Sequence, residues 1–169
     1  MLVTTRHGDL RTRPETEADA GFLFSLFETV KGPEMAAMPA DERTKRQLLS
    51  MQFRAMTQSY RAAFPGARYD IVLLDSEPIG RLILDLSPAR AHVVYVALVP
   101  EMRDRGIGTA LMAAILHEPR RHGAVCEAQV AIGNTPSLRL WKRLGFVERE
   151  RGETDVILEW RSASPINVK

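Results

Sequence analysis

The sequence has few of the features that mark secreted, membrane-spanning or nucleic-acid-binding proteins. It contains a single cysteine, Cys126, in 169 residues, which excludes an internal disulfide and favours a reducing compartment. No apolar run approaches the ~20 residues of a membrane span, and the first residues lack the apolar core of a signal peptide. The formal net charge of +2 is too small to indicate nucleic acid. We therefore expect a cytoplasmic protein with neither membrane nor nucleic-acid partners.

Two common phosphate-binding motifs are also missing. A Walker loop requires a lysine after its last glycine, and no lysine follows Gly106 and Gly108. A dinucleotide-binding loop requires a third glycine at the position that Leu111 occupies. Binding of ATP or NAD through these glycines is therefore disfavoured. No standard zinc-ligand spacing is present either, so we expect no metal.

The remaining composition is that of an ordinary globular protein. Hydrophobic residues make up 45% of the chain and charged residues 26%. A chain of this length can bury a real core, and no linker or internal repeat divides it. We therefore treat residues 1–169 as a single domain.

The first third of the chain predicts one strand and two helices. Leu10–Pro14 is a short strand, and Thr16 begins a helix whose apolar residues recur at helical spacing. Lys31–Pro39, with one glycine and two prolines, should break that helix. Asp41 can cap a second helix, which Phe64–Gly66 ends.

The middle of the chain predicts a hairpin, a strand and a helix. Two apolar runs, Tyr69–Leu74 and Ile79–Leu86, flank a short turn and predict the hairpin. A strand follows at His92–Val99, and then a helix to about Leu116, which Pro119 should end or kink.

The last part predicts a strand at Val125–Ala131 and a short helix that carries Trp141 and is closed by Gly145. A final hairpin pairs Phe146–Glu150 with Thr154–Trp160, and the tail beyond it should be frayed. Two early helices followed by strands mixed with helices predict an α/β or α+β fold with one sheet.

The stretch "VPEMRDRGIGTALM" (Val99–Met112) joins a predicted strand to a predicted helix through two glycines. Backbone N–H groups at a helix start lack intrahelical partners, and the helix dipole there favours negative charge. Glycines let the backbone approach a phosphate closely, and Arg103 and Arg105 add positive charge. The turn therefore predicts an anion site. A tight turn without a ligand is the alternative.

Two blocks of the sequence resemble the GNAT superfamily of N-acetyltransferases. "RDRGIG" resembles its R/Q-x-x-G-x-G/A acyl-coenzyme A motif, and "NTPSLRLWKRLGF" (Asn134–Phe146) resembles its second signature. The resemblance covers about Val93–Phe146. It implies a mixed, mostly antiparallel twisted sheet with flanking helices, whose fourth and fifth strands splay apart to admit the pantetheine arm. It also implies acetyl-coenzyme A as co-substrate.

The resemblance implies a role for each matching residue. Backbone groups around Leu98 and Val99 would pair with the pantetheine amides, and Arg103–Thr109 would wrap the pyrophosphate through N–H groups. Asn134 would hydrogen-bond the arm, although a helix cap is the alternative for this side chain. The expected coenzyme contacts are Leu98, Val99, Arg103, Asp104, Arg105, Gly106, Ile107, Gly108, Thr109, Asn134 and Trp141.

Trp141 departs from the family pattern, which has a tyrosine at this position that commonly protonates the departing thiolate. An indole N–H is not a usable acid, so Trp141 cannot take that role. We expect it to pack on the coenzyme arm or in the core.

Tyr95 and Ser137 are the candidate catalytic residues, with a surface or core hydroxyl as the alternative for each. A thiol has an ordinary pKa of ~8.5, so the thiolate leaves without a strong acid near neutral pH. No histidine or carboxylate stands out as a dedicated base, so the rate should follow the acceptor's own pKa. A rate limb near ~6.5, shared by different acceptors, would instead indicate His92 or His122.

These patterns predict an N-acetyltransferase that moves an acetyl group from acetyl-coenzyme A to an amine of a small molecule or peptide. Residues 16–63 would form the acceptor side and residues 91–146 the acyl-coenzyme A side. A non-catalytic acyl-coenzyme A-binding regulatory module is the alternative. A homodimer is left open, and no motif identifies the acceptor.

Overall fold

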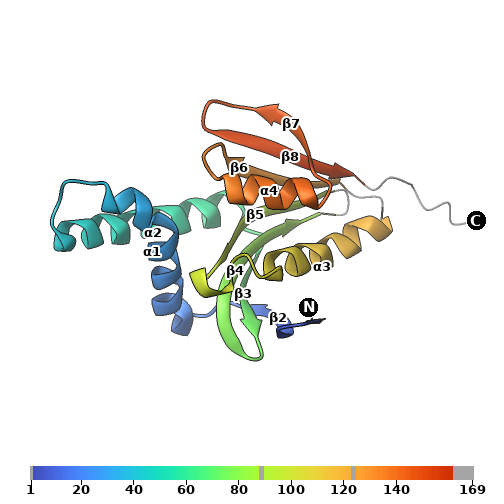
Figure 1. The fold of residues 1–169 in the computed structure, drawn as a ribbon, viewed down its shortest axis with the longest axis horizontal. Helices are drawn as coiled ribbons and strands as arrows, with labels where there is room; N and C mark the ends of the chain where they lie inside the picture. Colours follow the sequence, from blue (N-terminus) through green and yellow to red (C-terminus); the bar gives the residue numbers. More distant parts are fainter. Residues whose placement is uncertain (1, 88–89, 123–124, 162–169) are drawn as a thin grey trace, which may run out of the picture.

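The structure, a computed structural model, describes residues 2–87, 90–122 and 125–161 (Figure 1). The strands are β1 (Leu2–Thr5), β2 (Gly8–Pro14), β3 (Arg68–Leu74), β4 (Glu77–Leu86), β5 (Arg90–Leu98), β6 (Val125–Ala131), β7 (Val147–Arg151) and β8 (Asp155–Arg161). The helices are α1 (Ala20–Ala36), α2 (Glu42–Ala63), α3 (Ile107–His122) and α4 (Thr135–Arg143), with short 3-10 helices at Glu17–Asp19 and Pro100–Met102. None of the described helices is long and apolar enough to cross a membrane.

The eight strands form one sheet in the order β1-β2-β3-β4-β5-β6-β8-β7. All neighbours pair antiparallel except β5 and β6, which are parallel. The expected mixed, mostly antiparallel sheet with flanking helices is therefore confirmed.

The parallel pair β5–β6 is short. Residues Arg90–Val93 of β5 pair with Val125–Ala128 of β6, and beyond these residues the two strands part (Figure 1). From Tyr95 to Leu98, β5 pairs only with β4. These are the strands expected to splay, and the prediction is confirmed.

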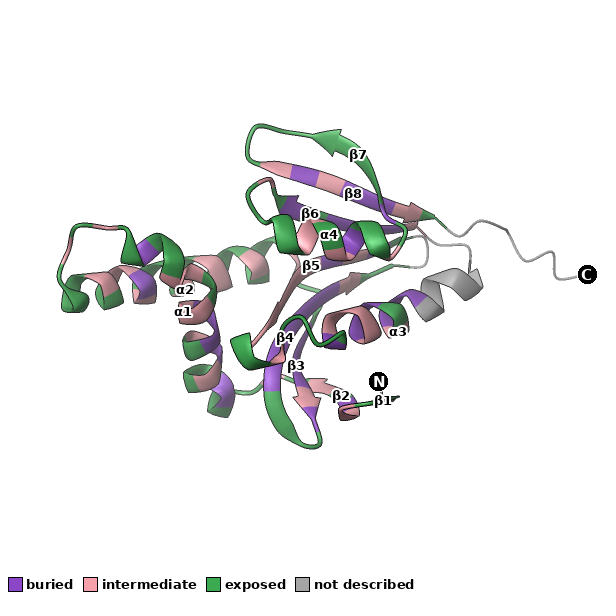
Figure 2. Cartoon of the chain, in the orientation of Figure 1, coloured by how far each residue is buried: buried purple, intermediate pink, exposed green. Residues whose placement is uncertain are grey.

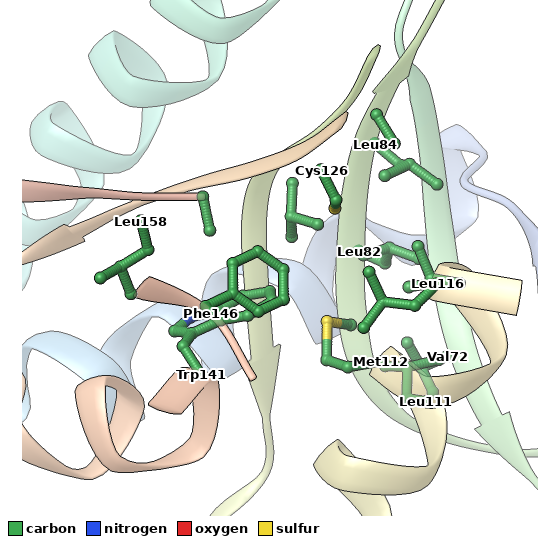
Figure 3. Packing of buried hydrophobic residues seen from close by; sticks show 14 of the residues in the cluster. Val72, Leu82, Leu84, Leu111, Met112, Leu116, Cys126, Trp141, Phe146 and Leu158 are labelled. Atoms are coloured by element: carbon green, nitrogen blue, oxygen red, sulfur yellow. The ribbon is translucent and has the colours of Figure 1, made fainter. Parts of the chain in front are cut away.

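The main core lies between the sheet and the helices α3 and α4. Alternate side chains of β4, among them Leu82 and Leu84, face this side, as expected for a strand with a period of two. Figure 3 shows how side chains from the sheet meet those of the two helices. The labelled residues are Val72, Leu82, Leu84, Leu111, Met112, Leu116, Cys126, Trp141, Phe146 and Leu158.

Helices α1 and α2 form a second, smaller cluster of apolar side chains. Phe27, Met35 and Leu49 are buried there, and the Phe53 ring packs 5.5 Å from that of Phe27. Much of both helices is exposed (Figure 2). Both helices meet the sheet: α1 lies against β4 and β5, and the Tyr60 ring of α2 lies 6.0 Å from that of Tyr95 on β5. The sheet therefore separates α2 from the face covered by α3 and α4.

Three sequence-based boundaries are wrong. The strand β1 was not expected; it is a short edge strand that pairs with β2 across a turn at Arg6 and His7. The first helix does not break at Lys31, because α1 continues through Pro33 to Ala36 and buries Met35 against α2. The helix α3 runs past Pro119 to His122. The tail after Arg161 lies outside the described residues.

Candidate active site

The glycine turn follows β5 and leads into α3, as the sequence predicts. Gly106 has φ +81°, a left-handed conformation that a side chain would strain, and nothing lies within 4 Å of where its Cβ would be. The Ala110 N–H donates to the Gly106 carbonyl at 3.0 Å, which closes the first helical turn. The N–H groups of Ile107, Gly108 and Thr109 therefore have no acceptor within the helix. The side chain of Ile107 is buried, so only its backbone can face a ligand.

The backbone groups of Leu98 and Val99, at the end of β5, point to opposite sides of the strand. The Val99 N–H donates to the Ile79 carbonyl at 2.9 Å, so this group already pairs with β4. Peptide groups of successive strand residues point in opposite directions, which directs those of Leu98 toward the gap. The Leu98 carbonyl there accepts a hydrogen bond from Arg103 Nε at 2.9 Å. Of the two residues expected to pair with the pantetheine amides, Leu98 is the one whose backbone faces the gap.

Arg103 connects the two sides of the molecule. Besides its bond to Leu98, it donates from Nη2 to Thr29 Oγ1 of α1 at 2.9 Å. Arg103 therefore links the end of β5 to α1, a helix of the expected acceptor side. Asp104 and Arg105 are exposed on the turn.

A hollow of about 360 Å³ lies beside the glycine turn. The β1–β2 turn forms one wall, where His7 Nε2 lies 3.0 Å from the Arg105 carbonyl and Arg6 Nη2 donates to the same oxygen at 3.4 Å. Neither residue was expected at the site. In the sequence, Arg6 and His7 stand out only as two basic residues before Gly8. Their place beside the glycine turn follows from the packing of β1 against α3, which the sequence does not predict.

Helix α4 packs on the same face of the sheet as α3, the face expected to bind the coenzyme. Asn134 caps it by accepting a hydrogen bond from the Ser137 N–H at 3.2 Å, which confirms the helix-cap alternative; contact with the coenzyme remains a prediction. A Cβ on Gly108 would lie 3.5 Å from Leu140 Cδ2 and 3.8 Å from Leu98 Cδ1. Gly108 thus faces the side chains of Leu140 on α4 and of Leu98 at the end of β5.

Trp141 is a core residue. It is 2% exposed, and its ring packs edge-on against Phe146 at 4.7 Å (Figure 3). Of the two packing positions expected for it, the structure has the one in the core.

The candidate catalytic residues lie on opposite faces of the sheet. Ser137 is on α4, whereas Tyr95 faces α2 and lies beside Tyr60. Burial, together with the neighbouring Tyr60, raises the pKa of Tyr95 to about 12. Its hydroxyl therefore stays protonated near neutral pH and can donate a hydrogen bond, but it is no base.

A buried ion pair lies near Tyr95, on the same face of the sheet. Arg81 of β4 donates from Nε to Glu15 Oε2 at 3.0 Å, and both side chains are almost fully buried. The guanidinium lies 6.0 Å from the centre of the Tyr95 ring. No sequence motif indicated this pair, although a lone arginine inside an apolar strand was a signal that a partner was needed.

The geometry agrees with the comparison to known families. The model of the acetyltransferase (GNAT) family matches residues 34–146. The chain belongs to this family. The family is one of acetyltransferases, and the match includes the glycine turn, whose role as the acyl-coenzyme A motif remains a prediction.

Two curated relatives match over short regions. One region of 63 residues is 40% identical to an uncharacterized N-acetyltransferase of Methanocaldococcus jannaschii and covers 37% of this chain and 27% of that protein. Another of 61 residues is 34% identical to an N-alpha-acetyltransferase of Sulfurisphaera tokodaii and covers 35% of this chain and 36% of that protein. The chain thus covers about a quarter of the first relative's length and about a third of the second's.

Solved structures share the fold over most of the chain. The PaiA N-acetyltransferase of Thermoplasma acidophilum, solved with coenzyme A, has a TM-score of 0.64 at 18% identity, covering 90% of this chain and 98% of that one. Arabidopsis thaliana Naa50, solved with the bisubstrate analogue CoA-Ac-MVNAL, has a TM-score of 0.59 at 14% identity, covering 89% and 97%.

Proposed function

We propose that this GNAT enzyme transfers an acetyl group from acetyl-coenzyme A to an amine of a small molecule or a peptide, by direct attack of the amine on the thioester. The observation that carries the proposal is the gap between β5 and β6, which opens beside the glycine turn. The expected anion-binding turn lies beside this gap on one face of the sheet, and Tyr60 and Tyr95 lie on the other face.

The coenzyme side fits acetyl-coenzyme A. Unpaired N–H groups at the start of α3 suit the pyrophosphate, and the Leu98 backbone suits the amides of the arm. A β5 N–H in the gap would polarise the thioester carbonyl. The thiolate can then leave without an acid, which is consistent with the burial of Trp141 in the core.

The acceptor side would consist of residues 16–63, which no coenzyme motif covers. Tyr60 of α2 and Tyr95 of β5 lie together on this face. The Tyr95 hydroxyl, which stays protonated, is suited to hold the amine or a water beside the thioester. A peptide α-amine is the first acceptor to test, because a curated relative is an N-alpha-acetyltransferase.

Two measurements test the proposal. Calorimetry should show binding of coenzyme A and of acetyl-coenzyme A. Release of free thiol from acetyl-coenzyme A should then accelerate with at least one member of a panel of short peptides with free α-amines, lysine peptides with blocked N-termini and small primary amines. The matched control is each acceptor with its amine acetylated in advance. Coenzyme binding without acceleration by any amine would contradict transfer to these acceptors.

A further inference from the structure

The face of the sheet that holds Tyr95 carries a buried arginine whose charge is only partly balanced. Arg81 of β4 is 2% exposed, and its Nε and Nη2 donate to Glu15 at 3.0 and 3.2 Å. Its Nη1 is buried and has no hydrogen-bond partner among the described residues. Buried polar groups without a partner are costly, and few occur in folded proteins. The part of the positive charge that lies on Nη1 therefore has no counter-ion in contact.

Arg81 lies next to the tyrosines of the expected acceptor side. In the sheet register, Ile83 is opposite Tyr95, and Arg81 comes two residues before Ile83, so the three side chains project to one face. The guanidinium lies 6.0 Å from the centre of the Tyr95 ring, which in turn lies 6.0 Å from that of the Tyr60 ring. An acceptor that approaches these two rings comes close to the charge of Arg81.

Arg103 adds a second positive charge to this face. Its hydrogen bonds to the Leu98 carbonyl and to Thr29 Oγ1 hold the guanidinium between the end of β5 and α1. Burial raises the pKa of Tyr95, while Arg81 and Arg103 oppose the shift. Both cations thus act at the Tyr95 hydroxyl.

The carboxylate that pairs with Arg81 does not balance the charge of this region. Glu15 is shared, because Arg61 of α2 pairs with the same carboxylate. One negative charge therefore faces two guanidinium groups, and Arg103 adds a third. The region around the tyrosines keeps a net positive charge.

Two further carboxylates of this face lie toward the closed end of the gap. Asp85 and Glu127 are both opposite His92 in the sheet register, beyond the extra residue Val94 of β5. Two arginines hold Glu127. Asp85 is four residues from Arg81 along β4, about 13 Å on an extended strand. The open end of the gap, where the two arginines of the acceptor side lie, is therefore positive.

Positive charge at the open end affects an acceptor in two ways. It stabilises a carboxylate close to the amine and destabilises a second cation, and both effects are strong where water is partly excluded. It also favours the neutral amine over the ammonium ion, and only the neutral amine can attack the thioester. An acceptor with a negative charge beside its amine would gain from the first effect.

We propose that Arg81 and Arg103 select peptide acceptors whose first residue is acidic, so that a carboxylate lies close to the reacting α-amine. This inference rests on the proposed function and names the class of acceptor. The carboxylate would balance the excess positive charge beside the tyrosines. The selection acts through charge rather than through direct contact with Arg81, because Nη1 is closed to solvent.

The test uses two peptides that differ only in charge, one with an N-terminal aspartate and the other with asparagine in its place. The value of kcat/KM is expressed per concentration of neutral amine, so that a difference between the amine pKa values does not enter. For wild type, kcat/KM for the aspartate peptide should exceed that for the asparagine peptide by about tenfold, as two opposite charges in a partly buried site would produce. A peptide with N-terminal lysine should react more slowly than either.

Two variants and a control test whether these arginines are the cause. Arg81→Gln and Arg103→Gln each remove one charge, so the ratio of the two kcat/KM values should fall by about threefold or more in both. Effects on coenzyme binding cancel in this ratio, because both peptides react with the same acetyl-coenzyme A. Arg139→Gln removes an exposed charge on α4, on the opposite face of the sheet, and should leave the ratio unchanged.

If Arg81→Gln does not fold, Arg103→Gln decides alone. A wild-type ratio of one or less would overturn the inference. A high ratio that a folded variant of either arginine retains would do the same, as would an equal fall in Arg139→Gln. Acetylation of the asparagine peptide without any preference for aspartate would leave the proposed function intact. If wild type acetylates no amine of the wider panel, the proposed function itself fails.

Discussion

Gly108 lies in the expected coenzyme motif, between a side chain of α4 and one of β5. A valine there would place its methyl groups between Leu98 and Leu140, beside the expected path of the coenzyme. We predict that Gly108→Val weakens coenzyme A binding by well over tenfold, ~1.4 kcal/mol or more, as measured by calorimetry. The fold should survive, because the Cβ itself makes only ordinary contacts.

The control for Gly108 is Gly32→Ala in α1, where nothing lies within 4 Å of a new Cβ. This variant should bind coenzyme A as wild type does. Unchanged affinity in a folded Gly108→Val would remove the glycine turn from the coenzyme site.

Individual site residues could be predicted from the sequence only where a motif covers them. The glycine turn leads into α3 and Asn134 begins α4, as the sequence predicts, while their contacts with coenzyme A remain predictions. Trp141 could be excluded as an acid from its chemistry, but its place in the core required the packing of α4 on the sheet. The placing of His92 and Tyr95 on one face of the sheet depends on a register shift in β5, and one extra residue in a strand leaves no sequence signal.

At the scale of elements, Arg103 adds a side-chain link between the end of β5 and α1. Arg103 reaches from Leu98 to the Thr29 hydroxyl. We predict that Thr29→Val lowers the free energy of unfolding by about 1 kcal/mol or more in urea titrations, because it removes the bond from Arg103 and the bond that the Thr29 hydroxyl donates to the Leu26 carbonyl at 2.8 Å. Amide exchange in α1 should become faster, while coenzyme A affinity stays within about twofold.

Thr57→Val provides the matched control on α2. The Thr57 hydroxyl is buried without a hydrogen-bond partner among the described residues. Its replacement by a methyl group therefore removes the cost of burying an unpaired polar group. This variant should be neutral or stabilising. An equal loss of stability in both variants would mean that the Arg103 contact contributes nothing.

The elements themselves were largely predictable, because caps and apolar periodicity are local signals. Asp41 caps α2 by accepting from the Thr44 N–H, and Gly145, with φ +89°, ends α4 as expected. The errors occur where packing overrides local preference. Pro33 costs α1 one hydrogen bond, but the burial of Met35 against α2 carries the helix on to Ala36.

At the scale of the whole molecule, we expect acid to destabilise the fold by protonating Asp19. The ion pair of Asp19 with Arg13 joins the segment just before α1 to β2. Arg13 Nη1 lies 2.7 Å from Asp19 Oδ2, and this bond holds the pKa of Asp19 well below its usual range. A depressed pKa stabilises the fold above the unfolded value of ~3.9, and this contribution is lost as the pH falls through the folded value.

We predict that Asp19→Asn is less stable than wild type at neutral pH in urea titrations, and that the difference shrinks below about pH 4. Glu17→Gln, two residues away and exposed, is the control and should change little at any pH. A gap between Asp19→Asn and wild type that stays constant down to strongly acidic pH would show that the carboxylate's charge is not what stabilises the fold.

In β5, Tyr95 pairs with Ile83 and Val93 with Leu84, so Val94 is an extra residue that constrains how the sequence of this strand can change in evolution. Each position before and after Val94 keeps its side of the sheet only because two residues, Val93 and Val94, separate His92 from Tyr95. Single-letter replacements in β5 alter one side chain at a time and leave the rest in place. Loss or gain of one codon in this stretch would instead exchange core and active-site positions on one side of the change. The strand is thus free to vary in composition but not in length.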